Sequence, residues 1–399
     1  MKKLLSAALA ALLLGGLPAC APSDPPGGTE PPETEPPETE ASAEAAECET
    51  AWEFMENFRV GWNLGLAMSF YTTGEDPFSA LSPEERVAAA QTMWGNPLTT
   101  QEMIDAVRDR GFNLIRVQVS YLNHMDGEGN VDPLWLDRVV EIVDYCMNAG
   151  VYCLLTSTGA GWLTAERDTF PEQSAVFRRM WEQIAARFTG HGSLLLFEAV
   201  NEVLNAEGAW WDPGREAYGV MNDLYQVFVD TVRAAGGCNA TRNLVLTPYA
   251  ATYDSSMNFY FRLPSDTAEG HLIAEVHCYD PVNFCFNEIN LGSADFRNVW
   301  GTAAERARLD EILEGVKERF TDRYGIPAIV GEFGVVDRAP EEERAEYIGY
   351  YAKTADKYGI GLVLFDDGYD FAVFDRRTLT WRYDALIDAL MTKGASVGE

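Results

Sequence analysis

The sequence predicts an α/β protein whose folded part is a single (β/α)8 barrel, the TIM-barrel architecture. Eight short apolar runs have the length and composition of buried strands. Helix-like patterns separate these runs in strict alternation, which implies parallel strands joined by right-handed crossovers. Residues 49–395 contain no second linker, and barrels of ~250 residues or more are among the few single domains of that size. The apolar runs lie at 60–64, 113–119, 151–157, 194–200, 243–247, 272–277, 328–332 and 361–365.

A doubly wound open sheet is the alternative arrangement for the same alternation of elements. Such a sheet usually carries a glycine-rich phosphate loop after an early strand, and this sequence has none. Two helix starts are well marked, by a capping-box pattern at Ser82 and by Asp132 before a proline, and Gly150 ends the second helix. The element after the fifth strand is poorly defined. Further helices are expected at 172–188, 215–235, 303–324, 341–358 and 383–391.

The first segment, residues 1–20, has the pattern of an export signal. Lys2 and Lys3 form the positive start, an apolar core follows at 4–17, and the segment ends in Leu-Pro-Ala-Cys at Cys20. This ending resembles a bacterial lipoprotein cleavage box, in which Cys20 becomes the lipidated first residue; an ordinary cleaved signal is the alternative. The apolar run is too short for a comfortable membrane span. In both cases we expect an extracellular or cell-surface protein of a bacterium.

Residues 21–48 are expected to form an acidic linker rich in Pro, Thr and Glu. The sequence TEPPE occurs twice in tandem, at 29–33 and 34–38. Proline donates no backbone hydrogen bond and the glutamates repel one another, so this segment should be an extended, disordered tether. With a lipid at one end, the tether would hold the domain at 49–395 off a membrane surface. That lipid is the only membrane contact that we expect.

The charge of the chain indicates its class of partner, and its histidine and cysteine content bears on metals and disulfides. The chain carries 62 acidic and 30 basic residues, a formal charge of −32, which argues against nucleic acid or an anionic polymer and is compatible with a neutral substrate. Histidine is scarce and no CxxC motif occurs, so we expect no metal and no cofactor. A monomer is expected. The cysteines after Cys20, at 48, 146, 153, 238, 278 and 285, are either paired or buried free thiols.

Polar side chains gather at the carboxyl ends of the predicted strands, which is where barrels carry their active sites. Glu202 ends the run LLLFEAVNE, and Glu332 ends the run IPAIVGEF. One such glutamate is usually a solvated loop residue, but six polar groups converging from four strands are hard to explain as structural accidents. In chain order the strand ends carry Trp62 and Asn63, Arg116 to Ser120, Ser157 and Thr158, Asn201 and Glu202, Pro248 and Tyr249, His277 and Tyr279, Glu332, and Phe365 to Asp367.

Seven motifs carry a resemblance to a known family. They are GWNLG at 61–65, MWGNPLTT at 93–100, GFNLIRVQVSY at 111–121, LLLFEAVNE at 194–202, EVHCYDP at 275–281, IVGEFG at 329–334 and FDDGYDFAVFDR at 365–376. With these motifs the chain resembles glycoside hydrolase family 5, the cellulase-type retaining glycosidases on (β/α)8 barrels. The resemblance implies that Glu202 is the acid/base and Glu332 the nucleophile. The supporting residues that it implies are Arg116, Asn201, His277 and Tyr279. From their places at strand ends and in loops, we expect four further residues to take part in substrate binding: Asn63, Phe365, Trp94 and Trp162.

Chemical reasoning independently supports these two roles. Retaining glycosidases hold two carboxyls about 5–5.5 Å apart, and glutamates reaching inward from the fourth and seventh strands can close that gap across a barrel rim. The nucleophile must be ionised, which Arg116 and a tyrosine hydroxyl favour. The acid must keep its proton, which partial desolvation and an ionised neighbour favour. Asn201 can donate a hydrogen bond to a sugar hydroxyl beside the reacting carbon.

Three positions depart from the family pattern, and all are expected on the glycone side of the site. Thr158 and Gly159 stand where members usually carry a histidine or a histidine pair. Phe365 stands where members usually place a tryptophan platform, and residues 66–68 alter the motif after GWNLG. His124 is a candidate replacement imidazole. We therefore expect weak activity on plain cellulose and room for a glycan that other members reject.

The expected function is that of an exported, endo-acting β-glycanase that cleaves β-1,4-glucan with retention. The alternative within enzymes is another β-glycan: mannan, xyloglucan or mixed-linkage glucan. The alternative outside enzymes is a catalytically weak glycan-binding lipoprotein. The missing histidine and tryptophan favour the binding protein, whereas the two retained glutamates favour the enzyme.

Overall fold

A closed barrel of eight parallel strands forms the centre of the computed structural model, which describes residues 48–286 and 296–392. Each strand pairs with the next, and β1 also pairs with β8, so the sheet has no free edge. This confirms the predicted fold class, and every observed strand matches its prediction to within one residue at either end. The strands are β1 (Gly61–Asn63), β2 (Leu114–Ser120), β3 (Tyr152–Thr158), β4 (Leu195–Asn201), β5 (Leu244–Leu246), β6 (Leu272–His277), β7 (Ala328–Phe333) and β8 (Gly361–Leu364).

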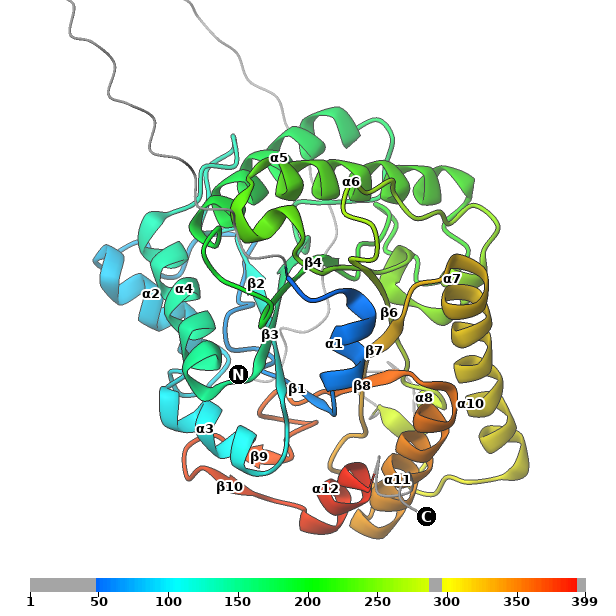
Figure 1. Cartoon of the computed structure of the whole chain (residues 1–399). Coiled ribbons are helices and arrows are strands. Elements are labelled where there is room, and N and C mark those ends of the chain that lie inside the picture. Colours follow the sequence, from blue (N-terminus) through cyan, green and yellow to red (C-terminus); the bar gives the residue numbers. More distant parts are fainter. Residues whose placement is uncertain (1–47, 287–295, 393–399) are drawn as a thin grey trace, which may run out of the picture. The chain divides into compact units, whose positions relative to one another are not determined.

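Helices occupy the connections between the strands and surround the barrel (Figure 1). The connection after β5, which the sequence left poorly defined, holds only short helical pieces. The helix expected at 303–324 divides into an α-helix and a π-helix. The helices are α1 (Ala51–Asn57), α2 (Pro83–Thr92), α3 (Gln101–Asp109), α4 (Pro133–Ala149), α5 (Phe170–Arg187), α6 (Arg215–Ala234), η1 (Gly237–Ala240), η2 (Tyr249–Ala251), α7 (Tyr253–Met257), α8 (Val282–Cys285), α10 (Ala303–Val316), η3 (Lys317–Tyr324), α11 (Glu341–Tyr358) and α12 (Asp384–Met391); a small hairpin, β9 (Phe374–Asp375) and β10 (Thr380–Trp381), follows β8.

Helix α1, which the sequence analysis did not identify, covers the amino-terminal end of the barrel (Figure 1, dark blue). Thr50 and Glu53 form a capping box at its start. Phe54 is fully buried, and its ring centroid lies 5.2 Å from that of Phe58 and 4.9 Å from that of Tyr152, the first residue of β3. These rings pack on the inward-facing residues near the strand starts. Apolar packing therefore fills this end of the barrel.

Inside the barrel, the apolar layer above α1 gives way to charged side chains toward the carboxyl ends of the strands. Side chains on one face of a strand are two residues apart. The residue two positions after each member of the apolar layer therefore also faces the barrel interior, one layer further along. On three strands that second residue is charged and buried, which requires a partner of opposite charge. The pairs are Leu114 and Arg116 on β2, Leu196 and Glu198 on β4, and Ile273 and Glu275 on β6.

Two β-bulges change which residues face inward near the carboxyl ends. Strand β4 gains one residue relative to β3 between Glu198 and Asn201, and β7 gains one relative to β6 just before Glu332. Asn201 lies three positions after Glu198, and Glu332 lies three positions after Ile329 of the apolar layer. In regular strands both residues would face away from the interior. The inserted residue reverses this, so both side chains turn inward.

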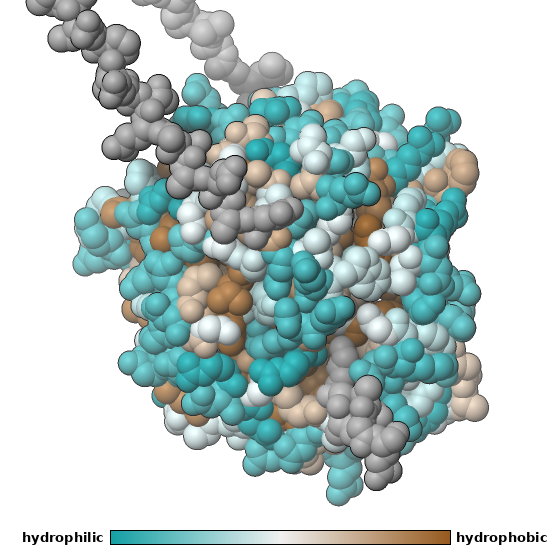
Figure 2. Space-filling view, in the orientation of Figure 1, coloured by the Kyte–Doolittle hydropathy of each residue, from teal (hydrophilic) through white to brown (hydrophobic). Residues whose placement is uncertain are grey.

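Two further observations concern the surface and the thiols of the described residues. Figure 2 shows a mostly hydrophilic face, and no helix of 48–286 or 296–392 is long and apolar enough to cross a membrane. Cys48, expected at the end of the linker, is buried and its backbone N–H donates to Thr241 Oγ1 at 3.0 Å. All six cysteines from Cys48 onward are free thiols. The expected export signal, Cys20 and linker residues up to 47 lie outside the described residues.

Candidate active site

Arg116 holds together the polar groups at the carboxyl end of the barrel. Its side chain is fully buried, and all five of its N–H groups donate. Two reach the carboxylate of Glu198 at 2.7 and 2.8 Å, and a third reaches Glu332 at 2.7 Å. The remaining two reach the amide oxygens of Asn201 at 2.8 Å and Asn63 at 3.0 Å. Because a guanidinium is planar and rigid, this arrangement fixes four side chains relative to one another.

Glu332 is the more buried of the two glutamates predicted for catalysis, with 5% of its surface exposed. Arg116 donates to its Oε1, and the hydroxyl of Tyr279 donates to its Oε2 at 3.0 Å. Burial raises the pKa of the carboxyl, whereas the cations His277 and Arg116 lower it. These contacts match the expectation that an arginine and a tyrosine hydroxyl attend this group.

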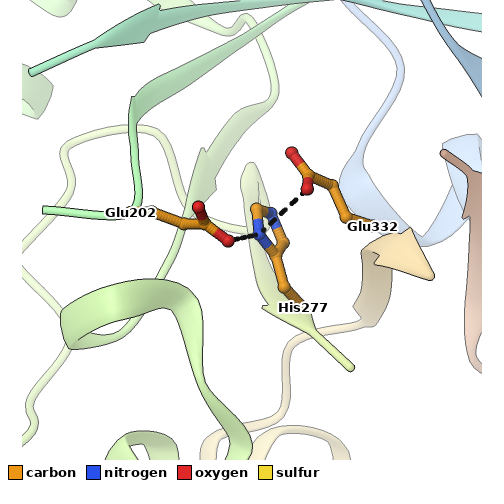
Figure 3. Close-up of side chains that lie close together, drawn as sticks. All are labelled: Glu202, His277 and Glu332. Atoms are coloured by element: carbon orange, nitrogen blue, oxygen red, sulfur yellow. Dashed lines mark hydrogen bonds and ion pairs between the residues drawn. The ribbon is translucent and has the colours of Figure 1, made fainter. Parts of the chain in front are cut away.

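Glu202 approaches the same place from the end of β4, with His277 between the two glutamates (Figure 3). Nδ1 of His277 lies 2.6 Å from Oε1 of Glu202 and 3.6 Å from Oε2 of Glu332. Glu202 has a φ of 36°, a left-handed backbone conformation that costs a non-glycine residue about 1–3 kcal/mol. Its side chain is 24% exposed, against 7% for Glu332. The strained backbone therefore directs a partly solvated carboxyl toward a buried one.

The charge of His277 follows from its surroundings. Burial alone would lower the pKa of the imidazole, but the carboxylates of Glu332 and Glu202 raise it to about 10. The ring is therefore a cation at neutral pH. Asn201, whose oxygen is held by Arg116, directs its amide N–H groups toward the site, with a long contact of 3.4 Å to Glu202.

Thr158 and Phe365, which depart from the family pattern, lie at the rim of the barrel. Their predicted places at the ends of strands agree with this. Thr158 is the last residue of β3 and pairs in register with Asn201; its hydroxyl accepts the backbone N–H of Ala160 at 3.3 Å. Phe365 follows β8 and is partly exposed. Its ring centroid lies 6.2 Å from that of Tyr279 and 5.3 Å from that of Phe371, in edge-on contacts. Phe365 thus stands beside the tyrosine that holds Glu332.

Three further sequence candidates occupy different surroundings. Trp162 is partly buried, and its indole N–H donates to the backbone oxygen of Thr158 at 3.1 Å. Trp94 packs edge-on against Phe70, and its buried indole N–H has no partner among the described residues. His124 stacks on Trp135 with ring centroids 3.6 Å apart, and burial lowers its pKa to about 4. His124 is therefore engaged with α4 and not with the carboxylates.

Comparison with known proteins assigns this site to a family. A family model described as cellulase (glycosyl hydrolase family 5) matches residues 76–370. The chain belongs to glycosyl hydrolase family 5. Endoglucanase A of Clostridium longisporum is 31% identical over 362 residues, which are 87% of this chain and 66% of that protein.

Solved structures of family 5 proteins have the same fold. A GH5-4 broad specificity endoglucanase from Ruminococcus champanellensis, with bound cellotriose, has a TM-score of 0.79 and 32% identity, and the match covers 88% of this chain and 100% of that one. A family 5 lichenase from Caldicellulosiruptor sp. F32, in complex with cellotetraose, has a TM-score of 0.79 and 29% identity, with 89% and 98% covered. The resemblance predicted from the seven motifs is confirmed, and the chain is a glycoside hydrolase.

In this family 5 barrel, Glu202, His277 and Glu332 each present one atom within 4.8 Å of the others. A cluster of that size can enclose a metal ion. Here the short contact from the His277 ring to Glu202 already joins two members through a proton, and the third receives hydrogen bonds from Arg116 and Tyr279. The arrangement therefore places a partly solvated carboxyl, which can exchange protons, beside a buried carboxyl held by hydrogen-bond donors.

Two buried residues that contact Arg116 escaped the sequence analysis. Glu198 and Glu275 lie inside apolar strand runs, are 0% exposed, and contact Arg116 from β4 and β6. Burial raises the pKa of Glu198 to about 7, in spite of the neighbouring Arg116. The available signal was a glutamate within an otherwise apolar strand, because such a residue needs a buried partner.

The raised pKa of Glu198 predicts that stability falls as pH rises from about 4.5 to about 7. In that interval the folded protein retains a proton that the unfolded chain has released, and stability is lost as the pH increases. His277, with a folded pKa of about 10 against 6.5, adds a loss of the same sign at higher pH. Glu198→Gln should therefore lessen the decrease in melting temperature between pH 5 and pH 7, by at least ~2 °C.

The matched control is Asp223→Asn, which removes an exposed carboxylate paired with Arg167. It should leave the pH slope as in the wild type, because surface ion pairs contribute little. An unchanged slope in Glu198→Gln, measured by scanning calorimetry at both pH values, would show that Glu198 does not carry the proton.

Proposed function

We propose that this family 5 chain is an endo-acting β-glucanase that hydrolyses β-1,4-linked glucan with retention. Glu332 is the nucleophile and Glu202 the general acid/base. The observation that carries the proposal is the spacing of their oxygens, within 4.8 Å. Retaining enzymes need carboxyls about 5–5.5 Å apart, whereas inverting enzymes need about 6.5–9.5 Å to admit a water.

In the first step, an oxygen of Glu332 attacks the anomeric carbon, and the bond from that carbon to the glycosidic oxygen breaks as Glu202 gives its proton to the glycosidic oxygen of the leaving sugar. The product is a covalent glycosyl ester of Glu332. In the second step, Glu202 takes a proton from water, the water oxygen bonds to the anomeric carbon, and Glu332 leaves as a carboxylate. The greater exposure of Glu202 suits the group that must meet water.

The supporting residues fit defined tasks in this scheme. Arg116 and Tyr279 each donate to one oxygen of Glu332, which favours its ionised form before attack and on departure. Asn201 offers an amide N–H to a sugar hydroxyl beside the reacting carbon. Asn63 helps to orient Arg116. Phe365, Trp94 and Trp162 supply apolar ring surface near the rim for the faces of the sugar rings.

The roles of the two glutamates predict different losses in their variants. Glu332→Gln should abolish turnover while glycan binding remains. Glu202→Ala should lower kcat/KM on glycans roughly 10²–10⁴-fold, because the general acid is lost. On a dinitrophenyl glycoside, whose leaving group needs no proton, Glu202→Ala should still form the glycosyl-enzyme at a near wild-type rate. Stopped-flow release of dinitrophenol measures that step.

Two results would overturn the assignment. One is a Glu332→Gln protein that an activated glycoside glycosylates as fast as it does the wild type. The other is a Glu202→Ala protein that loses the activated substrate and the glycan equally. Intact-mass spectrometry of the trapped enzyme supplies the readout, and a wild-type protein that binds glycans without any turnover would favour the binding-protein alternative.

The substrate preference of the site depends on Thr158 and Phe365. A lichenase among the similar structures favours mixed-linkage glucan as a second candidate substrate. A threonine is too short to make the hydrogen bonds of a histidine, and each bond lost in the transition state reduces the rate about ten- to a hundred-fold. A phenylalanine also offers less stacking surface than a tryptophan.

The double variant Thr158→His with Phe365→Trp should gain about tenfold in kcat/KM on soluble cellulose derivatives and lose activity on branched β-glycans. Reducing-sugar assays over cellulose derivatives, mixed-linkage glucan, mannan and xyloglucan measure both changes. Strong cellulase activity in the wild type that the double substitution leaves unchanged would contradict this account. The single variants show which position is responsible.

We also propose that the chain is exported and held at the bacterial surface through a lipid on Cys20. The support is the sequence alone: a short apolar signal, a cleavage box ending at Cys20 and an acidic tether. Cys20→Ser should block processing or release the protein from membranes, whereas the control Cys238→Ser should leave it in the membrane fraction. A wild-type protein found wholly in the soluble fraction, with a free amino terminus within the tether, would indicate an ordinary signal peptide.

A further inference from the structure

His277 has a carboxylate oxygen at each of its ring nitrogens. Nδ1 lies 2.6 Å from Oε1 of Glu202, and Nε2 lies 3.3 Å from Oε1 of Glu275. Ionised carboxylates only accept hydrogen bonds, and a neutral imidazole has a single N–H to donate. Both contacts can be hydrogen bonds to carboxylates only when the ring carries two protons and a positive charge. Glu275 is therefore the second acceptor that makes the doubly protonated ring the favoured form.

The barrel provides a dedicated place for the Glu275 carboxylate. It is 0% exposed, and Oε1 also lies 3.4 Å from Nε of Arg116, while Oε2 has no hydrogen-bond partner among the described side chains and backbone groups. Gly331, on the neighbouring strand β7, leaves room for it: a Cβ at this position would overlap Oε1 of Glu275. A buried carboxylate with one oxygen unpartnered is costly, so its retention needs a reason other than packing.

The charged and titratable groups around this carboxylate come from several elements. Arg116 approaches from β2, Glu198 from β4, His277 from β6 itself and Glu332 from β7. The hydroxyl of Tyr225 on α6, which bonds Thr247, is the remaining titratable group that senses Glu275. With Glu202, four carboxyls therefore share two cations, and among the residues that the structure describes only His277 contacts both Glu275 and Glu202.

We propose that Glu275 is a positioning residue for glycan hydrolysis, which acts through His277 by accepting its Nε2 proton and keeping the ring as an imidazolium that faces Glu202 and Glu332. The effect on the reaction rests on the roles proposed above for the two glutamates. An imidazolium favours the ionised form of a carboxyl beside it. In the glycosyl-enzyme, where Glu332 is esterified and uncharged, the imidazolium keeps Glu202 ionised and ready to accept a proton from water.

Glu275→Gln tests this proposal with little change in shape. The glutamine oxygen can still accept the Nε2 proton, but the negative charge that favours the imidazolium is gone. His277 then loses one of the three carboxylates that favour its charged form, so the ring gives up its second proton at a lower pH than in the wild type. Because the ring lies 2.6 Å from Glu202 and Glu275 lies at the opposite ring nitrogen, losing the ring's charge removes the cation nearest to the general acid, and this outweighs the loss of the more distant carboxylate. The alkaline limb of the pH profile of kcat/KM should move to higher pH by roughly one unit, because in the variant the ring loses its charge at a lower pH.

The direction of the shift separates this proposal from simpler roles. A shift of the alkaline limb to lower pH would mean that Glu275 acts only as a buried negative charge on the glutamates, and it overturns the proposal. Loss of thermal stability without a shift would mean a purely structural role and also overturns it. Glu275→Asp keeps the charge and should keep the wild-type limbs, even if its rate is lower.

The control is Asp266→Asn, which removes a carboxylate whose side chain is 5% exposed and which pairs with Arg233 at 2.7 Å. It should lower stability to a similar extent and leave the pH limbs in place. A shift equal to that of Glu275→Gln would show that loss of any buried charge moves the profile, and the proposal would be wrong.

A measurement independent of activity reads the ring directly. The chain has four histidines, so nitrogen-15 NMR of the histidine-labelled full-length protein can assign His277 by comparison with His277→Gln. The wild type should show both ring nitrogens protonated from pH 6 to pH 8, whereas in Glu275→Gln the second ring proton should be lost at a lower pH than in the wild type. A neutral ring in the wild type at pH 6 overturns the proposal. A correct NMR result with no hydrolysis of any glycan would instead point to failure of the proposed function.

Discussion

The polar end of the barrel depends on one buried guanidinium. Each of the five N–H groups of Arg116 donates to a different acceptor atom. Those atoms belong to four side chains from β1, β4 and β7. A buried charge is tolerated only when it is paired and hydrogen-bonded. Arg116 and its buried carboxylate partners therefore depend on one another for compensation of their charges. Truncating it would leave Glu198 and Glu332 as uncompensated charges, which typically costs about 3–5 kcal/mol.

Around this fixed cation, the two glutamates differ in the way that a two-step reaction requires. Glu332 belongs to a strand and is enclosed, with both oxygens held by hydrogen-bond donors. Glu202 belongs to the residue after a strand, has a left-handed backbone and remains partly open to solvent. The closed barrel holds Glu332 rigidly in a strand. The left-handed backbone at Glu202 directs its side chain toward Glu332. His277 lies between them and senses both charges.

The fold was predictable because its signal is spread along the whole chain: eight apolar runs alternate with helical patterns, and each run appears as a strand. The two glutamates were located because they end such runs. The sequence did not show whether each strand side chain faces into or out of the barrel. Strands of a parallel barrel are buried on both faces, so polarity does not alternate and cannot distinguish inward from outward positions.

The bulges before Asn201 and Glu332 change which side chains face the barrel interior. No pattern of residues in the sequence predicts where such an extra strand residue lies. Glu198 and Glu275 were missed for a related reason, since their partner Arg116 is distant in sequence and adjacent only after the barrel closes. Helix α1 was missed because it is short, and its value lies in the rings that it packs against the barrel interior.

Gly331 limits the order in which this site can change during evolution. Its missing side chain is the space that Glu275 occupies, so an alanine there collides with the carboxylate as long as Glu275 is present. Position 331 can therefore accept a larger residue only after position 275 has become smaller, whereas position 275 can change first without that obstacle. The pair is epistatic, and a lineage that has filled position 331 cannot easily regain the buried carboxylate.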